Sequence, residues 1–282
     1  MTRLRRRGLL GLAGAVALAA AGCGEDDDVS EPGTETSSGT TDGPRRVTYG
    51  DDPSQFGELS LPAGDPRGVV VVIHGGFWSA AYGLDLGRPL AASLVEEGWA
   101  AWNLEYRRVG DGGGTPATFD DVAAGIDALA GLDLDLSTVV TVGHSAGGHL
   151  AVWAAGRQRY GWSDGGVAVT HAVSQAGVLD LVASERDGLG GGAAAALLGH
   201  VPAEGEDERY DPRQQVPLDV PVWCVHAGDD TTVPIAQSET YVAAATAAGA
   251  TAELIEVDGG HFAVIDPTTP AWDAVLTLLD QI

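Results

Sequence analysis

The serine at the centre of a G-x-S-x-G pattern is the residue of this chain whose surroundings point most clearly to chemistry. Residues 143–147 read Gly-His-Ser-Ala-Gly, and the serine is Ser145. In this pattern the serine occupies a sharp turn between a strand and a helix, where its hydroxyl is exposed above the sheet. A serine hydroxyl is a weak nucleophile, so it needs a base to take its proton and an acid to orient that base. The pattern therefore predicts a histidine and a carboxylate close to Ser145 in the fold.

A carboxylate and a histidine occur at matching places later in the chain. Asp229 and Asp230 follow an apolar run at 220–227, and His261 follows the next predicted strand at 252–257. The carboxyl ends of parallel strands meet at one edge of a sheet, where the serine turn is also expected. We predict that His261 is the base and that one of the two aspartates is the acid. Only one of them can orient the histidine, and their adjacency leaves both open.

Backbone amides for binding a carbonyl oxygen are predicted directly after the apolar run at 69–74. The sequence continues through two glycines to Phe and Trp, and glycine permits backbone angles that point amides toward a substrate. We assign the oxyanion hole, the set of N–H groups that binds the developing negative charge, to the amides of Gly76, Phe77 and Ala146. Trp78 follows and is predicted to line the acyl pocket. The alternative is that this segment is only a tight turn.

The elements that position these residues follow from short apolar runs that alternate with helical patterns from Val47 onward. Such alternation is typical of an α/β fold with a doubly wound, mainly parallel sheet and helices on both faces. The fully apolar run Val-Val-Val-Val-Ile-His predicts a buried strand. The predicted strands are 69–74, 99–106, 138–142, 167–176, 220–227 and 252–257, and the predicted helices are 86–97, 119–132, 146–157, 235–248 and 270–279.

One stretch breaks this alternation. Residues 184–215 are rich in glycine, alanine and acidic residues. We interpret them as a short insertion before the acid-bearing strand, close to the site, where a mobile cap would shape the leaving-group side.

Composition excludes several other functions. The 282 residues include 40 acidic and 15 basic ones, which gives a formal net charge of −25. All the basic residues are arginine, so no lysine is present for a Walker-type phosphate site or a Schiff base. An acidic surface repels phosphate backbones, which excludes nucleic acid as a partner. Two cysteines are too few for a Cys-based zinc site, and we expect no cofactor and no metal.

The other histidines are expected to have structural roles. His74 is predicted to hold the turn after its strand, His144 to pack inside the serine turn, and His149 to face the sheet from the following helix. A metal site is not expected, because the remaining histidines have no carboxylate or cysteine partner at ligand spacing. These are His171, His200 and His226.

The first 45 residues are predicted to lie outside the folded domain, which we place at 46–282. Four arginines precede an uncharged run that ends at Cys23 and resembles a bacterial lipoprotein signal. It predicts a signal peptide over 1–22, lipidation of Cys23, and a disordered acidic tether over 23–45. The protein would then be exported and held by its lipid on the outer face of the cell membrane. An ordinary secretory peptide stays open, as do Sec and twin-arginine export.

Together these motifs resemble the α/β-hydrolase superfamily, and within it the esterases and kynurenine-formamidase-like enzymes that carry H-G-G-x-W. The resemblance covers about residues 47–282. It implies an α/β-hydrolase fold with a Ser–Asp–His triad, and its G-x-D-x-x-V-P pattern implies that Asp230 rather than Asp229 is the acid. The residues that carry it are 74–78, 103–108, 143–150, Asp230 with Val233 and Pro234, and 260–262 with Asp266 and Pro267.

The function expected from these residues is hydrolysis of a small carboxylic ester, or of an arylformamide-type amide, through an acyl-enzyme. Ser145 attacks, His261 moves the proton and Asp230 holds the imidazole. Two alternatives stay open: a non-catalytic surface lipoprotein that uses the fold as a binding module, and a small peptidase of the prolyl-peptidase-like type. Bulky side chains after the oxyanion turn favour short acyl groups, and the negative field favours neutral or cationic substrates.

Overall fold

The computed structural model describes residues 43–163 and 165–282. The predicted signal peptide, Cys23 and most of the predicted tether lie outside the described residues. The first described strand, β1, begins at Arg45. In the described part of the chain, no helix is both long enough and apolar enough to span a bilayer.

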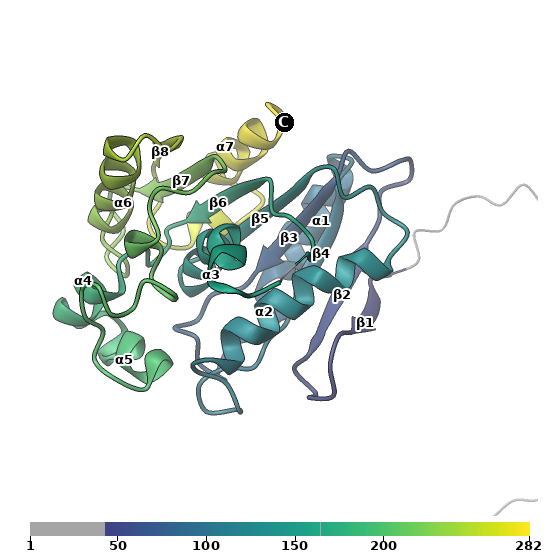
Figure 1. Ribbon diagram of the computed structural model, residues 1–282. Helices are drawn as coiled ribbons and strands as arrows, with labels where there is room; N and C mark the ends of the chain where they lie inside the picture. The colour runs from purple at the N-terminus through teal and green to yellow at the C-terminus, as the bar shows by residue number, and fades with distance from the viewer. Residues whose placement is uncertain (1–42, 164) are drawn as a thin grey trace, which may run out of the picture. The chain divides into compact units, whose positions relative to one another are not determined.

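An eight-stranded sheet lies at the centre of the described chain (Figure 1). Its strand order is β1-β2-β4-β3-β5-β6-β7-β8. β2 pairs antiparallel with both β1 and β4, and the other neighbouring strands are parallel. The strands are β1 Arg45–Thr48, β2 Phe56–Ser60, β3 Val69–Ile73, β4 Ala100–Leu104, β5 Val139–His144, β6 His171–Gln175, β7 Val222–Ala227 and β8 Ala252–Val257.

α-Helices connect the parallel strands and begin at recognisable signals. The Asp180 and Thr269 side chains accept backbone N–H bonds at the starts of two of them, which satisfies amides that have no partner inside the helix. The described helices are α1 Arg88–Glu96, α2 Ala117–Asp127, α3 Ala146–Gly156, α4 Leu181–Arg186, α5 Ala193–Leu198, α6 Ala236–Ala247 and α7 Pro270–Leu279.

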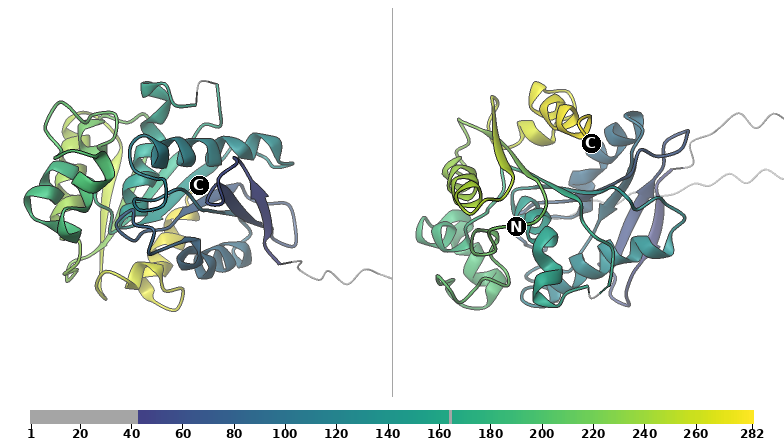
Figure 2. Two further views of the ribbon diagram at one scale, coloured as in Figure 1. Left: turned by 90° about the horizontal axis from the view of Figure 1, so that it is seen from below. Right: turned by 45° about the horizontal axis from the view of Figure 1, so that its top comes forward.

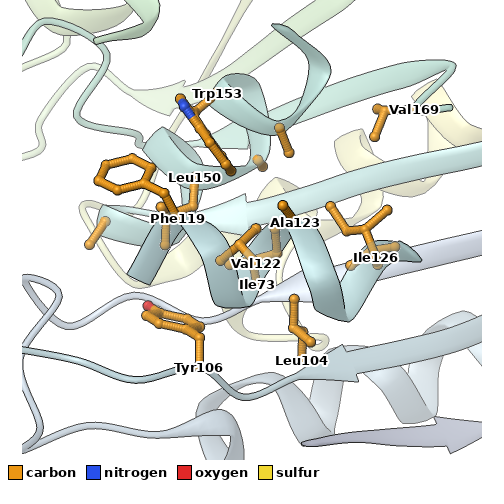
Figure 3. Close-up of a cluster of buried hydrophobic side chains, with 14 of the residues drawn as sticks. Ile73, Leu104, Tyr106, Phe119, Val122, Ala123, Ile126, Leu150, Trp153 and Val169 are labelled. Carbon is orange, nitrogen blue, oxygen red and sulfur yellow. The ribbon is translucent and has the colours of Figure 1, made fainter. Parts of the chain in front are cut away.

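The helices bury both faces of the sheet. Alternate residues of β3 point to opposite sides: Val71 packs with α2 and α3, and Val72 packs with α1 and α7. The right-hand view of Figure 2 shows α1 and α7 on one side of the sheet and α2 and α3 on the other. Figure 3 shows part of the core on the α2 and α3 side, where Phe119 lies against Trp153. Burial on both sides explains why β3 is apolar throughout.

The predicted fold class is confirmed, and the differences lie at the edge of the sheet and at the ends of its elements. The antiparallel strands β1 and β2 are not among the predicted strands, because each is only four or five residues long and partly polar. The predicted strand over 167–176 is shorter, since β6 begins only at His171. The predicted helix over 119–132 divides into α2 and a short 3-10 turn.

The predicted insertion over 184–215 is packed onto the domain at several points. The Leu197 carbonyl accepts a hydrogen bond from the Thr115 amide at 2.8 Å, and the Leu197 side chain is fully buried. The Trp153 indole on α3 donates to the Arg209 carbonyl at 2.8 Å, and His149 Nε2 donates to the Tyr210 carbonyl at 2.8 Å. These contacts attach the insertion to the helix that begins at the serine turn.

A buried carboxyl group lies within this insertion. Asp211 is fully buried and accepts hydrogen bonds from the Arg213 amide at 3.1 Å and from the Gln214 amide group at 3.0 Å. Burial raises the pKa of Asp211 to about 7; the hydrogen bond from Gln214 opposes this rise, and nearby Asp180 adds to it. In the unfolded chain an aspartate has a pKa of about 3.9. Asp211 therefore stabilises the fold less as the pH rises from about 4 to about 7.

Asp211→Asn tests this pH dependence, because asparagine cannot ionise. We expect the melting temperature of the variant, measured relative to the wild type by circular dichroism, to rise by at least about 2 °C between pH 5 and pH 8. Asp219→Asn is the matched control, since the Asp219 side chain is 96% exposed, and its difference from the wild type should not change with pH. Equal differences for Asp211→Asn at both pH values would contradict the assignment.

Candidate active site

The serine turn has the strained backbone of a nucleophile elbow. Ser145 has φ 54° and ψ −117°, in the region that favours glycine. Its amide donates to the Gln175 carbonyl of β6 at 2.8 Å, and its carbonyl accepts from the His149 amide at 3.1 Å. A Cβ on Gly147 would collide with the Ile73 carbonyl of β3. Glycine at this position therefore lets the first turn of α3 lie directly against the end of β3.

The loop after β3 is also strained, and it lies beside the serine. Gly76, Phe77 and Trp78 have φ values of 109°, 54° and 53°. A Cβ on Gly75 would lie 3.2 Å from the Ser145 Cβ, so the loop and the nucleophile are in close proximity. Within residues 43–163 and 165–282, the amides of Gly76 and Phe77 donate no hydrogen bond to a protein atom. Those two N–H groups are available to a ligand.

Buried Glu105 stabilises the start of this loop, at His74. Glu105 Oε1 accepts from His74 Nε2 at 2.9 Å and pairs with Arg108 at 2.9 Å, and Oε2 accepts from the Leu84 amide at 3.0 Å. The Tyr106 hydroxyl donates to the His74 carbonyl at 2.8 Å, and the two rings stack with centroids 4.4 Å apart. Burial alone would raise the pKa of Glu105, but the hydrogen bonds, above all that from His74, hold it below its usual value. The carboxylate is thus charged and fixes the strand end that leads into the loop.

The structure brings His261 to Asp230. His261 Nδ1 lies 2.7 Å from Asp230 Oδ2, and both side chains are almost completely buried. Asp230 Oδ1 accepts from the amides of Thr232 at 2.7 Å and Val233 at 2.9 Å. Burial alone would raise the pKa of Asp230, but hydrogen bonds from two histidines and these amides outweigh it and hold the pKa well below its usual range. Asp230 therefore stays ionised and fixes the proton of His261 on Nδ1.

Asp229 has a different partner. Its Oδ1 accepts a hydrogen bond from the Gly260 amide at 2.9 Å, and the residue is exposed. This contact ties the loop after β7 to the loop that carries His261. Of the two adjacent aspartates, Asp230 is the one whose carboxylate contacts the imidazole.

Two residues at neighbouring strand ends hold the loop that carries His261. His144 Nε2 donates to the His261 carbonyl at 2.8 Å, and the two rings lie 4.5 Å apart. Gln175 donates from its side-chain amide to the Val264 carbonyl, while its own carbonyl accepts from the Ser145 amide. Burial lowers the pKa of His144 to about 3, and the charge of His261 adds to this effect. His144 is therefore neutral and acts as a hydrogen-bond donor, not as a second base.

Trp78 does not line an open pocket as the sequence suggested. The side chain is 1% exposed, lies in the hydrophobic core, and donates from Nε1 to His149 Nδ1 at 3.2 Å. The positive φ of Trp78 turns its side chain inward, which the sequence pattern does not reveal. The exposed aromatic residue beside the loop is Tyr82, which is 45% exposed and whose ring lies against Gly76. Phe77 is half-buried and lies against Gly190 of the insertion.

Two of the histidines expected to lack carboxylate partners do have them. His226 Nε2 is 3.4 Å from Asp230 Oδ2, and His200 Nε2 is 2.8 Å from Asp207 Oδ1. The first pair is four residues apart and joined by a turn, which brings the side chains together without a helical spacing pattern. His149 also differs from its prediction, because it contacts Trp78 and the insertion. Even so, no group of three or more metal-ligating side chains occurs among the described residues.

The fold and the site together define the class of protein. The residues predicted as nucleophile, acid and base follow β5, β7 and β8, and the loop of free amides follows β3, all at the carboxyl edge of a mainly parallel sheet. This is the arrangement of an α/β-hydrolase.

Comparison with known proteins identifies the family within this class. The model of the BD-FAE family matches residues 59–244, so the chain belongs to this family of α/β-hydrolase-type esterases. A comparison with curated protein sequences gives no significant match.

Solved structures of esterases have the same fold. A bifunctional GH43-CE protein from Bacteroides eggerthii is 25% identical, with a TM-score of 0.72 over 84% of this chain and 35% of that one. The chain thus spans about a third of that protein's length. A thermophilic esterase from the planctomycete Thermogutta terrifontis is 22% identical, with a TM-score of 0.69 over 85% of this chain and 91% of that one. Esterase B from Lactobacillus rhamnosis is 23% identical, with a TM-score of 0.70 over 84% and 83%.

Proposed function

We propose that the protein hydrolyses carboxylic esters through a covalent acyl-enzyme on Ser145. The observation that carries this proposal is the 2.7 Å contact between Asp230 and His261 at the sheet edge where the strained serine turn meets the loop of free amides. These groups supply a nucleophile, an oriented base and donors for an oxyanion, which are the parts that acyl transfer requires. Family membership independently supports an esterase.

In the proposed mechanism, Ser145 Oγ attacks the ester carbonyl carbon while His261 Nε2 takes the hydroxyl proton. The negative charge that forms on the carbonyl oxygen is bound by the amides of Gly76, Phe77 and Ala146. Collapse of the tetrahedral intermediate breaks the bond to the leaving alcohol, which receives the proton from His261. A water molecule then repeats the sequence on the acyl-enzyme and releases the acid. Asp230 stabilises the imidazolium in both halves without itself taking the proton.

We propose short acyl groups as the preferred substrates. Phe77 and Tyr82 lie on the oxyanion loop, Phe77 against Gly190 and Tyr82 against Gly76, so bulky side chains occupy both sides of it. Among the structural neighbours, the Thermogutta terrifontis esterase binds propionate and butyrate, and the Lactobacillus rhamnosis esterase is inhibited by a C4 tributyrin phosphonate. We extend the proposal to aryl alcohols as leaving groups, with arylformamides as the amide counterpart. One structural neighbour is named as a carbohydrate esterase, so acetylated sugars are substrates to test beside the aryl esters.

The alternatives lack a supporting observation. A binding module that had lost catalysis would not need the strained backbone of Ser145, since each strained residue costs about 1–3 kcal/mol. It would also not need the buried contact between Asp230 and His261. A peptidase of the prolyl-peptidase-like type would need a site for an extended peptide. The first experiment below tests the binding module, and the second tests the peptidase.

The first prediction concerns the three proposed catalytic residues. Wild-type protein should be labelled by a fluorophosphonate probe, and Ser145→Ala should not be labelled. His261→Ala should lower kcat on p-nitrophenyl acetate about as far as Ser145→Ala, by at least about 10⁴-fold, because the base and the nucleophile act as a unit. Asp230→Asn should lower kcat by up to roughly 10⁴-fold, since it favours the wrong tautomer of the histidine.

Asp229→Asn is the matched control for the acid. It changes the neighbouring aspartate, whose carboxylate contacts only the Gly260 amide among the hydrogen bonds of the described residues, so kcat should fall far less. A larger loss for Asp229→Asn than for Asp230→Asn would show that the acid is wrongly assigned. Absence of labelling in folded wild-type protein would favour the binding module.

The second prediction concerns the substrate. On p-nitrophenyl esters from acetyl to palmitoyl, kcat/KM should be highest at acetyl to butyryl and fall steeply beyond, because a longer chain overlaps the packed loop. The same experiment should include an N-formyl aniline, an acetylated sugar and a short peptide. A maximum at long chain length would contradict the short-acyl proposal. Ester turnover without formamide turnover would remove only the formamidase part, and efficient peptide cleavage would favour the peptidase.

The third prediction concerns the export segment, which we propose is a lipoprotein signal with Cys23 as the lipidated residue. In a bacterial host, the full chain should fractionate with membranes, and Cys23→Ala should appear in the soluble or secreted fraction. The catalytic rate of the released protein should equal that of the wild type, because the described domain begins some twenty residues after Cys23. Membrane retention of Cys23→Ala would contradict lipidation.

A further inference from the structure

Besides His261, two further buried polar side chains, His226 and Ser238, are connected to Asp230. His226, near the end of β7, has Nε2 2.8 Å from the Val233 carbonyl and 3.4 Å from Asp230 Oδ2. Its other ring nitrogen, Nδ1, lies 2.8 Å from the hydroxyl of Ser238 on α6. The side chains of His226 and Asp230 are fully buried, and Ser238 is 0% exposed. Polar groups at this depth remain only where partners satisfy them.

The partners of His226 determine where its proton lies. The Val233 carbonyl and the Asp230 carboxylate only accept hydrogen bonds, so Nε2 carries hydrogen. Nδ1 faces a hydroxyl, which can donate to it. When Nδ1 accepts from the Ser238 hydroxyl, Nε2 donates into the turn that contains Asp230.

His226 also closes the turn that orients Asp230. Asp230 Oδ1 is held by two backbone amides of this turn, and Oδ2 lies 2.7 Å from His261 Nδ1 and 3.4 Å from His226 Nε2. His226 Nε2 also donates to the Val233 carbonyl of the same turn. These two histidines are the only basic side chains within 4.0 Å of the Asp230 carboxylate among the described residues. His144 faces His261 from β5 and donates to the His261 carbonyl.

We propose that His226, with its tautomer fixed by Ser238, is a positioning residue that holds the carboxylate of Asp230 against His261. This inference rests on the proposed serine esterase function. It predicts that loss of the Nε2 donor frees the Val233 carbonyl and lets the turn that carries Asp230 shift, which weakens the contact to His261 without altering the surface that binds substrate. Supporting residues of this kind typically contribute about 10–100-fold to the function of the group they orient.

The test compares three substitutions in the full protein. His226→Leu removes both ring nitrogens, Ser238→Ala removes the group that fixes the tautomer, and His226→Gln keeps one acceptor and one donor with similar spacing. On p-nitrophenyl acetate we expect kcat to fall about 10–100-fold for His226→Leu with KM nearly unchanged, a smaller loss for Ser238→Ala, and partial recovery in His226→Gln. His171→Leu is the matched control, because His171 stacks on Trp223 and its ring contacts no residue of the site.

A second readout does not depend on turnover. A proton on His261 Nδ1 bonded to Asp230 gives a far-downfield NMR signal, which is assigned by its absence in His261→Ala. The signal should weaken or vanish in His226→Leu and persist in His226→Gln and His171→Leu. If the wild type hydrolyses no ester and reacts with no fluorophosphonate, the proposed function fails, and this signal still reports whether His226 holds Asp230.

The outcomes separate cleanly. An unchanged kcat and an unchanged signal in folded His226→Leu overturn the inference. If His226→Leu does not fold, Ser238→Ala decides: a lower kcat at constant KM supports the inference, and an unchanged kcat overturns it. A change in KM alone would also overturn it, because it would place His226 in substrate binding.

Discussion

The close approach of α3 to β3 is the constraint on which the rest of the site depends. Gly147 brings the first turn of the helix against the last carbonyls of the strand, where any side chain would collide. This approach places the strained Ser145 beside the loop that follows β3, and so brings the proposed nucleophile and the free amides to one point. Because these contacts are between backbones, no change of side-chain rotamer can relieve a misfit. The remaining groups have to be brought to this fixed point by their own loops.

Buried polar residues hold each of those loops. Glu105 fixes the loop that bears Gly76 and Phe77, Gln175 fixes the segment after His261, and His226 meets Asp230 from behind. A buried charge or amide is costly unless all its partners are present, so each contact tolerates only one arrangement of its loop. The site thus combines an apolar sheet that supplies stability with a few polar contacts that supply position.

The sequence was sufficient for the parts of the molecule that depend on chain order and periodicity. The apolar runs of β3, β5 and β7 repeat the pattern of a parallel sheet, and the serine motif occurs at one of the junctions that this pattern defines. It was insufficient where the side-chain direction depends on backbone angles. Trp78 follows the oxyanion turn in sequence, but its positive φ turns it into the core, while Tyr82, four residues later, lies over Gly76.

The sequence likewise did not predict which residues the buried polar side chains contact. His226 and Asp230 meet through a turn, and Glu105 meets His74 across two neighbouring strands, so neither pair has a fixed spacing that a pattern can detect. The short antiparallel strands β1 and β2 were missed for a related reason. β1 pairs with β2 and β2 with β4 at the edge of the sheet, and four or five partly polar residues carry little strand signal of their own.

The position of β1 has a mechanical consequence. This strand is the first described element of the chain and the outermost of the sheet, and it is held by a four-residue antiparallel ladder with β2 alone. Tension applied to the chain ahead of Arg45 therefore loads this ladder first. β2 and β4 separate it from β3, the first strand whose end contributes to the site. A pull on the N-terminal side would detach one short edge strand while the strands that carry the proposed nucleophile, acid and base keep their register.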